Sequence, residues 1–533
     1  MDLIDWSVIA TYLCLLITMS IFVGRGQTGQ EDYYVGGRNL AWWAVGISTM
    51  ATQTSAVSFI SIPAFVALKP EGGLTWIQYE LAVPLAMIAT SILLLPLFRK
   101  LELISVYAYL ELRFGPSMRT LISAIFLFSR SFGTAVGLYA SAIVLAVVMQ
   151  IPIWATILLM GVFTVIYDAI GGMKAVVYSD VVQSLILFIG IFVCIYFAIK
   201  DLGGIGAVLE TIPKERMQTL DLSFGINDNS HTPFWGFLIG SFFLYLAYYG
   251  TDQSQVQREL SAKTIADTRK SLFLNGYVRF PLALLYLSLG LALGGFYLSN
   301  AEFQNEVPLD LMDFMVPVFV LQHLPSGIRG LLVAALLAAS MSSLDSALNS
   351  LSAATIRDFV ERIRPLSEKQ SLWSGRLATL FWGTVITGLA YGVGNIADTV
   401  IESINKVGST VYGPILAAFL VGVLSRRATT IAILLGVVAG VGCNLYLWLA
   451  HPHIFWMWWN LFGLVVSVLT TWIFSMFTLS RPEAEISQYT LRGSGIYQEI
   501  PLWSRGETYM LLYFFLILSV VIGIDLYVAH FWR

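Results

Sequence analysis

Long apolar runs recur along the whole chain, separated by short clusters of charged residues, glycine or proline. A helix needs about 20 mostly apolar residues to cross the hydrocarbon core of a membrane, so each run predicts a transmembrane helix. About fourteen runs meet this requirement, and we expect an all-α membrane protein. The predicted spans lie near residues 4–24, 40–67, 75–98, 117–148, 152–171, 178–200, 233–252, 272–297, 327–356, 371–393, 397–424, 428–450, 454–478 and 509–529.

The composition supports this interpretation. Of 533 residues, 57% are hydrophobic and only 12% are charged, about half the charged share of an ordinary soluble protein. The net charge of −3 leaves no basic surplus for binding nucleic acid. Most of the 30 Lys and Arg residues fall in alternate loops, which by the positive-inside rule are cytoplasmic. This distribution predicts a multi-pass protein of the cell membrane with both termini outside.

Polar residues inside predicted spans are costly and therefore indicate function. In the ninth span, Ala339, Ser342, Ser343 and Ser346 share one helical stripe, and Asp345 lies beside it. Such a stripe suits close helix packing, but its oxygens also suit a hard cation such as sodium, and packing alone does not need a carboxylate.

Two further spans contain polar residues of this kind. The second carries Thr54, Ser55 and Ser58, followed by Pro63, which predicts an interrupted helix or a simple proline kink. In the sixth, Asp180 is expected either to cap the helix or to bind a cation.

Charges inside other spans require a partner or a water-filled cavity. Glu80, Arg130 and Arg279 are such charges, and each has a structural alternative as half of an ion pair. The seventh span ends in Tyr248, Tyr249 and Gly250, where the glycine is expected to break the helix and the aromatic rings to stack on a ligand or anchor the interface. The chain has no Walker-type, HExxH or GxSxG motif, so neither ATP hydrolysis nor these enzyme chemistries are indicated.

Several ordered motifs resemble the solute:sodium symporter family, which includes sodium/glucose cotransporters. The resemblance covers about residues 30–430. The matching segments are Asp32 to Arg38, Arg99-Lys100, Ser105 to Gly115, Gly171-Gly172, Ser179 to Gln183, Val256 to Arg258, and Met341 to Ser350.

The resemblance implies the LeuT-type fold, a 5+5 inverted repeat with one extra N-terminal helix and three extra C-terminal helices. It divides the chain into residues 1–30, a leading helix and cytoplasmic link; 31–426, the core; and 427–533, the peripheral helices. The repeats are expected at about 40–200 and 233–424. The implied function is transport without an enzymatic step. A non-transporting membrane sensor is the alternative from another class.

The resemblance also implies the binding residues. For a first co-transported sodium they are Ala51, Thr54, Ala339, Ser342 and Ser343, and for a second sodium they are Asp180, Ser342, Asp345 and Ser346. For the substrate they are Ser55, Ser58, Glu80, Tyr248, Arg279 and Asn405, with Arg130 one turn from Gly133, the position at which sialic acid carriers have an arginine.

By the resemblance, Glu80, Tyr248 and Arg279 match an acid, a gating tyrosine and a lysine of the sugar carriers, which favours a sugar or similar polar solute. The two buried arginines instead favour a small carboxylate such as sialic acid, a monocarboxylate or an amino acid. Sodium is the expected coupling ion, one or two per cycle, with a proton as the rival. The expected partners are thus the solute, sodium and membrane lipid, without nucleic acid. The sequence is compatible with a monomer and does not fix the oligomeric state.

Overall fold

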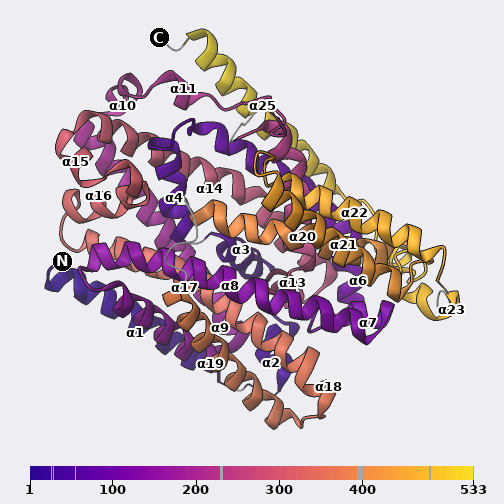
Figure 1. The fold of residues 1–533 in the computed structure, drawn as a ribbon. Coiled ribbons are helices and arrows are strands. Elements are labelled where there is room, and N and C mark those ends of the chain that lie inside the picture. Colours follow the sequence, from indigo (N-terminus) through magenta and orange to yellow (C-terminus); the bar gives the residue numbers. More distant parts are fainter. Residues whose placement is uncertain are drawn as a thin grey trace.

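The computed structural model describes residues 1–25, 27, 29–54, 56–227, 232–392, 400–478 and 482–531. These residues form helices joined by short loops, and their strand-like pairing is a single isolated bridge between Leu40 and Ala262 (Figure 1). The predicted all-α class is therefore confirmed. Among the described residues, ten helices are long and apolar enough to cross a membrane, and one bent pair raises that number to eleven.

The long helices coincide with most of the predicted spans. They are α1 (Leu3–Val23), α8 (Pro116–Met149), α9 (Ile153–Leu202), α14 (Ile265–Ser299), α17 (Ile328–Thr355), α19 (Glu368–Gly392), α20 (Val400–Leu424), α21 (Thr430–Ala450), α22 (Trp458–Ser475) and α25 (Arg505–Phe531). All of these except α19 are among the ten helices that are apolar enough to cross a membrane, and the tenth is the continuous segment Leu74–Leu93. The shorter elements used below are α2 (Gln30–Val35), α3 (Trp42–Gln53), α4 (Ala56–Ala67), η2 (Leu74–Leu81), α5 (Ala82–Leu93), α10 (Ile205–Thr211), α12 (Ser241–Thr251), α13 (Gln253–Glu259) and α15 (Ala301–Glu306).

The second predicted span is interrupted, which decides between the two alternatives of a broken helix and a simple proline kink. Its two halves, α3 and α4, are bent by 55°. Thr54 ends α3 with φ −86° and ψ 75°, outside the helical region. Pro63 lies inside α4, so the interruption is not at the proline.

The seventh predicted span is broken at Asp252, not at Gly250 as the sequence predicts. Asp252 is extended (φ −78°, ψ 125°) and caps α13 by accepting a hydrogen bond from the Ser254 amide at 2.8 Å. Gly250 remains helical, and a Cβ there would lie 2.4 Å from Leu94. The glycine therefore allows α12 to pack closely against the segment that follows α5.

Helix α9 contains two predicted spans and reverses direction between them. Tyr167 and Asp180 both contact one turn of α17, through Asp345 and Ser342. On a straight helix these two residues would be ~20 Å apart. The chain turns back at Gly172, whose backbone (φ 56°, ψ −160°) is not helical.

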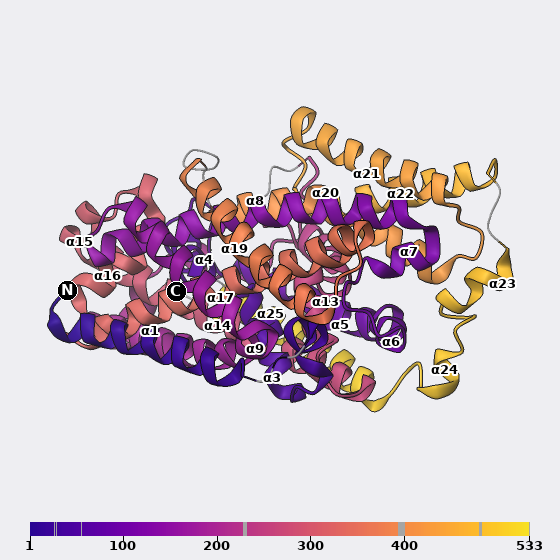
Figure 2. The same ribbon diagram turned by 90° about the horizontal axis from the view of Figure 1, so that it is seen from below.

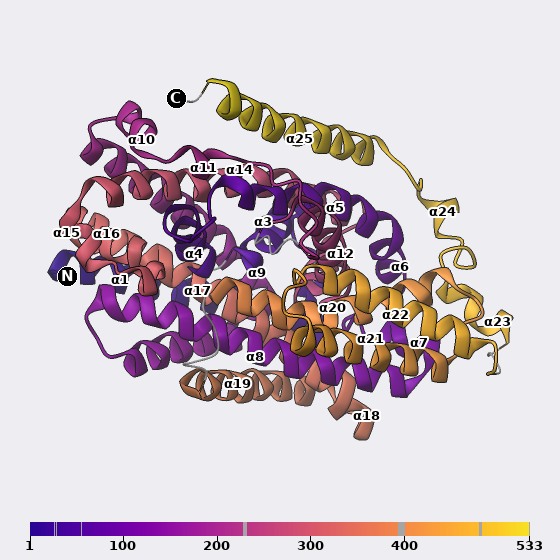
Figure 3. The same ribbon diagram turned by 45° about the horizontal axis from the view of Figure 1, so that its top comes forward.

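Helix α17 is the most buried of the membrane-crossing helices in the described part of the chain, and it packs most extensively against α9 and α8. Figures 1 and 2 show α1 at one edge of the molecule and α21 with α22 at another, where they pack against α20. Helix α25 runs along the outside of α5 and α14 (Figure 3), and the Tyr513 hydroxyl donates to the Tyr277 carbonyl at 2.8 Å.

The turn at Gly172 gives a stability test. A Cβ at this position would lie 2.7 Å from the Tyr33 ring and 2.8 Å from its carbonyl oxygen, on a backbone that favours glycine. We expect Gly172→Ala to destabilise the protein by about 1–3 kcal/mol. The measurement is the thermal midpoint of the purified protein in detergent. Gly206→Ala in α10 is the matched control, because its Cβ meets nothing within 4 Å; equal losses in both variants would contradict the assignment.

Candidate functional site

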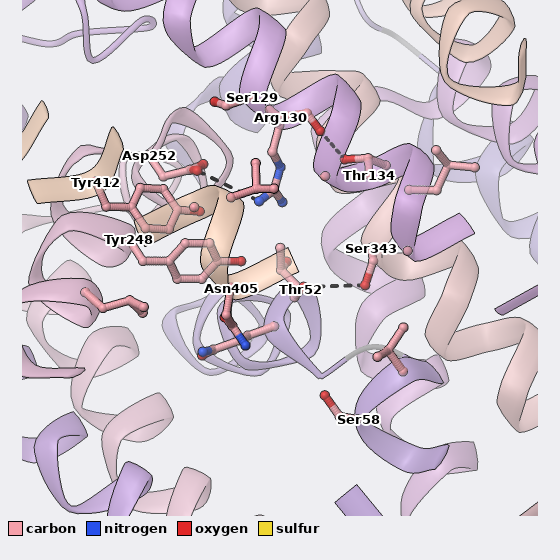
Figure 4. A pocket seen from close by; sticks show the side chains of 18 of the residues that line it. Thr52, Ser58, Ser129, Arg130, Thr134, Tyr248, Asp252, Ser343, Asn405 and Tyr412 are labelled. Carbon is pink, nitrogen blue, oxygen red and sulfur yellow. Dashed lines mark hydrogen bonds and ion pairs between the residues drawn. The ribbon is translucent and has the colours of Figure 1, made fainter. Parts of the chain in front are cut away.

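A cavity of about 190 Å³ lies where the two broken helices face α8, α17 and α20 (Figure 4). It brings together residues that are far apart in the sequence. Of the predicted substrate residues, it is lined by Ser58, Glu80, Arg130, Tyr248, Arg279 and Asn405. Ser55 lies outside the described residues. Ser343 of the predicted first sodium set also lines this cavity, so the two predicted sites adjoin.

Arg130 of α8 is the cavity arginine without a close carboxylate partner. Its Nη1 lies 3.8 Å from Asp252 Oδ2, and its Nε has no hydrogen-bond acceptor among the described residues. Its guanidinium carbon is 5.9 Å from the centre of the Tyr248 ring, which in turn packs against Tyr412 at 6.1 Å. Figure 4 shows Arg130 with these two tyrosines on one side of the cavity and Thr52 with Ser343 on another.

Arg279 differs because Glu80 already neutralises its charge. Nη2 of Arg279 donates to Glu80 Oε1 at 2.6 Å, and Nε donates to Oε2 at 3.2 Å. Both side chains are buried. A paired arginine of this kind supports the cavity wall and has less capacity to bind an anion.

The C-terminal end of α3 faces the serine stripe of α17, and this arrangement joins the predicted first sodium residues. Ser343 Oγ lies 3.5 Å from the Thr52 carbonyl and 3.4 Å from the Ala339 carbonyl. The last carbonyls of a helix carry partial negative charge and lack helical partners, so this end attracts a cation. Ala51 and Thr54 belong to the same turn, where the Thr54 amide donates to the Ala51 carbonyl at 3.0 Å.

The predicted second sodium residues surround a buried arginine. The Ser342 hydroxyl donates to Asp180, and Ser346 accepts from Nη2 of Arg258. The same Nη2 lies 3.6 Å from Asp180 Oδ2. Arg258 is 1% exposed, and its guanidinium provides positive charge among these residues.

Asp345, also in the predicted second set, faces α9. It accepts a hydrogen bond from the Tyr167 hydroxyl, and Ser346 Oγ lies 3.2 Å from its Oδ1. Thus Ser346 lies close to Asp345 and to Arg258 alike.

Three residues of these clusters were not predicted, and neither was Asp168, a buried acid of α9 on which the charge of Arg258 acts. Arg258 lies in one of the family motifs, in which no role was predicted for it. Tyr412 lies in an apolar span without a distinctive neighbour. Asp252 is the last residue of the predicted seventh span. Asp168 is an acid inside the predicted span 152–171, so the rule that singled out Glu80 would also have found it.

An all-helical, multi-pass membrane fold with two broken helices around a polar cavity defines a membrane transporter. The sequence model of the Sodium:solute symporter family matches residues 33–440. The chain therefore belongs to this family, and it is a sodium-coupled symporter, not an enzyme.

Two relatives and one solved structure illustrate the similarity. The Xenopus laevis sodium-coupled monocarboxylate transporter 1 is 29% identical over 83% of this chain and 71% of its own length. The sodium/sialic acid symporter NanT of Aliivibrio fischeri is 29% identical over 83% of this chain and 87% of its own length. The substrate-bound, outward-open structure of a Na+-coupled sialic acid symporter has a TM-score of 0.80 and 24% identity, and the match covers 90% of this chain and 99% of that one.

The Glu80–Arg279 pair gives the second test. Glu80→Gln leaves the arginine buried without its counter-charge, and we expect a loss of about 3–5 kcal/mol in the free energy of unfolding. Glu31→Gln is the control, because Glu31 pairs with Arg38 at 2.7 Å but its side chain is 60% exposed; about 1 kcal/mol or less is expected there. Urea unfolding in detergent measures both. Similar losses would show that burial does not set the strength of the Glu80 pair.

Proposed function

We propose that this symporter takes up a small carboxylate together with sodium, and that Arg130 receives the carboxylate. The observation that supports the proposal is the difference between the two cavity arginines. Arg279 has a bidentate partner in Glu80, whereas Arg130 lies 3.8 Å from Asp252 and retains an unused Nε donor. An arginine with donors available binds a carboxylate strongly.

The relatives favour this alternative over the sugar that the sequence weakly favoured. One is described as a monocarboxylate transporter and another as a sialic acid symporter, and both of these substrates carry a carboxylate. Tyr248 and Tyr412 beside Arg130 provide aromatic surface and hydroxyls for the rest of the solute.

We place the coupling sodium between the end of α3 and the stripe of α17. Its proposed ligands are the Ala51 carbonyl, Thr54, the Ala339 carbonyl, Ser342 and Ser343. Sodium there neutralises the negative end of α3 and holds this broken helix against α17, beside the cavity. Such binding favours one conformation over the other, which is how an ion gradient is coupled to transport.

The proposed second sodium set, Asp180, Ser342, Asp345 and Ser346, stays a prediction. Arg258 lies 3.6 Å from Asp180 and donates to Ser346, so we propose that a second sodium enters only where this guanidinium has moved away.

We also propose fourteen membrane crossings, with two from α9, one each from α3–α4 and α12–α13, and one from α19. The reversal of α9 at Gly172 supports the count. The outside location of both termini and the division at residues 30 and 426 remain predictions from the sequence.

Sodium binding can be tested with Ser343→Ala. We expect the sodium concentration that gives half of the maximal fluorescence change to rise about tenfold, because the variant loses an oxygen ligand worth about 1.4 kcal/mol. Intrinsic tryptophan fluorescence during NaCl titration in detergent measures the affinity. Ser350→Ala is the control, because among the described residues the Ser350 hydroxyl bonds to the Ser346 and Ala347 carbonyls of its own helix. Unchanged affinity in Ser343→Ala would refute the ligand assignment.

Carboxylate recognition can be tested by thermal shift with lactate, pyruvate and N-acetylneuraminate against lactamide and glucose. We expect at least one carboxylate to raise the melting temperature in NaCl but not in KCl, and lactamide and glucose to have no effect. Arg130→Gln should abolish the shift, while Arg505→Gln, a change at an exposed arginine, should retain it. Stabilisation by glucose or lactamide in place of the acids would overturn the proposal.

A further inference from the structure

Asp168 of α9 is a fully buried carboxylate that neither proposed site uses. Its side chain is 0% exposed, and neither carboxylate oxygen has a hydrogen-bond partner in the described part of the chain. The side-chain amide of Asn349 is the neutral donor that faces Asp168. Its nitrogen is not within hydrogen-bond distance of Asp168 or of any other acceptor in the described part of the chain. An ionised carboxylate without donors is very costly in such an environment.

The neighbouring charges do not neutralise Asp168. Arg258 is the cation that acts on it, and this guanidinium is already engaged with Asp180, Ser48 and Ser346. The groups that face Asp168 electrostatically are Arg258 of α13, Asp180 and Tyr167 of α9, Asp345 of α17, and Tyr33 and Tyr34 of α2, with Arg376 of α19 beside Tyr33. Three carboxylates therefore share one guanidinium.

A metal ion does not suit this position. Hard cations require several oxygen ligands at once, whereas Asp168 is faced by an amide nitrogen and a guanidinium. Within the described ranges, no group of three or more His, Cys, Asp or Glu side chains converges as a metal site would. A proton needs no ligand shell and removes the charge of the carboxylate directly.

Helix α2 covers this region of α9. The Tyr33 ring and carbonyl lie against Gly172, one helical turn beyond Asp168. Gln257 Nε2 donates to the Tyr34 carbonyl at 2.6 Å and to Asn349 Oδ1 at 2.7 Å. The tyrosine hydroxyls are in turn bonded to Thr379 and Ser352, both at 3.1 Å. The same residues thus hold α2 in place and position the amide that faces Asp168.

We propose that Asp168 is a proton-binding site, distinct from the sodium and substrate sites, which is occupied while α2 is packed over it. Displacement of α2 admits water, and the carboxyl then ionises and releases its proton. Because the proton binds the packed state more tightly, lower pH favours the packed state, by at most about tenfold per pH unit for one proton.

Infrared difference spectroscopy tests the site without substrate or sodium. A protonated carboxyl without hydrogen bonds has a carbonyl stretch at higher frequency than a carboxylate or a hydrogen-bonded acid. We subtract the infrared spectrum of Asp168→Asn from that of wild type, both at neutral pH in KCl, and expect the difference to show this band. Asp345→Asn is the matched control, since Asp345 accepts from Tyr167, and it should retain the band.

Three outcomes would overturn the proposal. The first is a carboxylate band in place of the acid band in the Asp168→Asn difference, and the second is loss of the band in Asp345→Asn. The third is loss of the acid band when NaCl is added to wild type, which would assign the position to sodium. If Asp168→Asn fails to fold, wild type labelled with ¹³C-aspartate identifies the band as that of an aspartic acid by isotope shift, and the effect of Gln257→Ala on its titration assigns it to the position under α2. Gln257→Ala, which loosens α2, should lower the pH at which the band disappears; an unchanged titration would refute the role of α2.

Discussion

The buried guanidinium of Arg258 connects the elements on which the binding region depends. From α13 it donates to Ser48 of α3 at 2.9 Å and to Ser346 of α17, and it lies 3.6 Å from Asp180 of α9. A charge inside a membrane protein must be compensated locally because lipid offers no water. This requirement ties the four helices to one arrangement, and the broken end of α3 is thereby held opposite the serines of α17.

If sodium binds where we propose, that arrangement couples the ion to the solute through a shared wall. Ser343 faces the Thr52 carbonyl at the end of α3 and also lines the cavity. A cation at this position stabilises the contact between α3 and α17, which forms one side of the solute cavity. Coupling then needs no chemical step, since each ligand shifts the same conformational equilibrium by its differential affinity for the two states.

Much of this organisation can be predicted from local sequence, because hydrophobic span length and the cost of intramembrane charge are local properties. They give most spans, the interrupted second helix and the polar residues of the cavity. These local properties do not predict which charged side chains pair with each other in the folded protein. Glu80 pairs with Arg279 across 199 positions, and Arg258 collects partners from three other helices. The break at Asp252 depends on a side-chain cap. Glycine at position 250 predicts a helix break from the sequence, whereas in the structure it allows close packing against Leu94.

The pairing also decides how a solute can act on the fold. In the proposed mechanism, an anion bound by Arg130 would compete with Asp252, which lies at the break between α12 and α13 and caps α13. Arg258 is on that same short helix, so we propose that a change at Asp252 would move the guanidinium that contacts α3, α9 and α17. An anion bound at Arg279 would not act on α13 in this way, because the charge of Arg279 is neutralised by Glu80 on η2. The arginine with the longer, weaker ion pair is therefore the one through which solute binding can be transmitted to the broken helices.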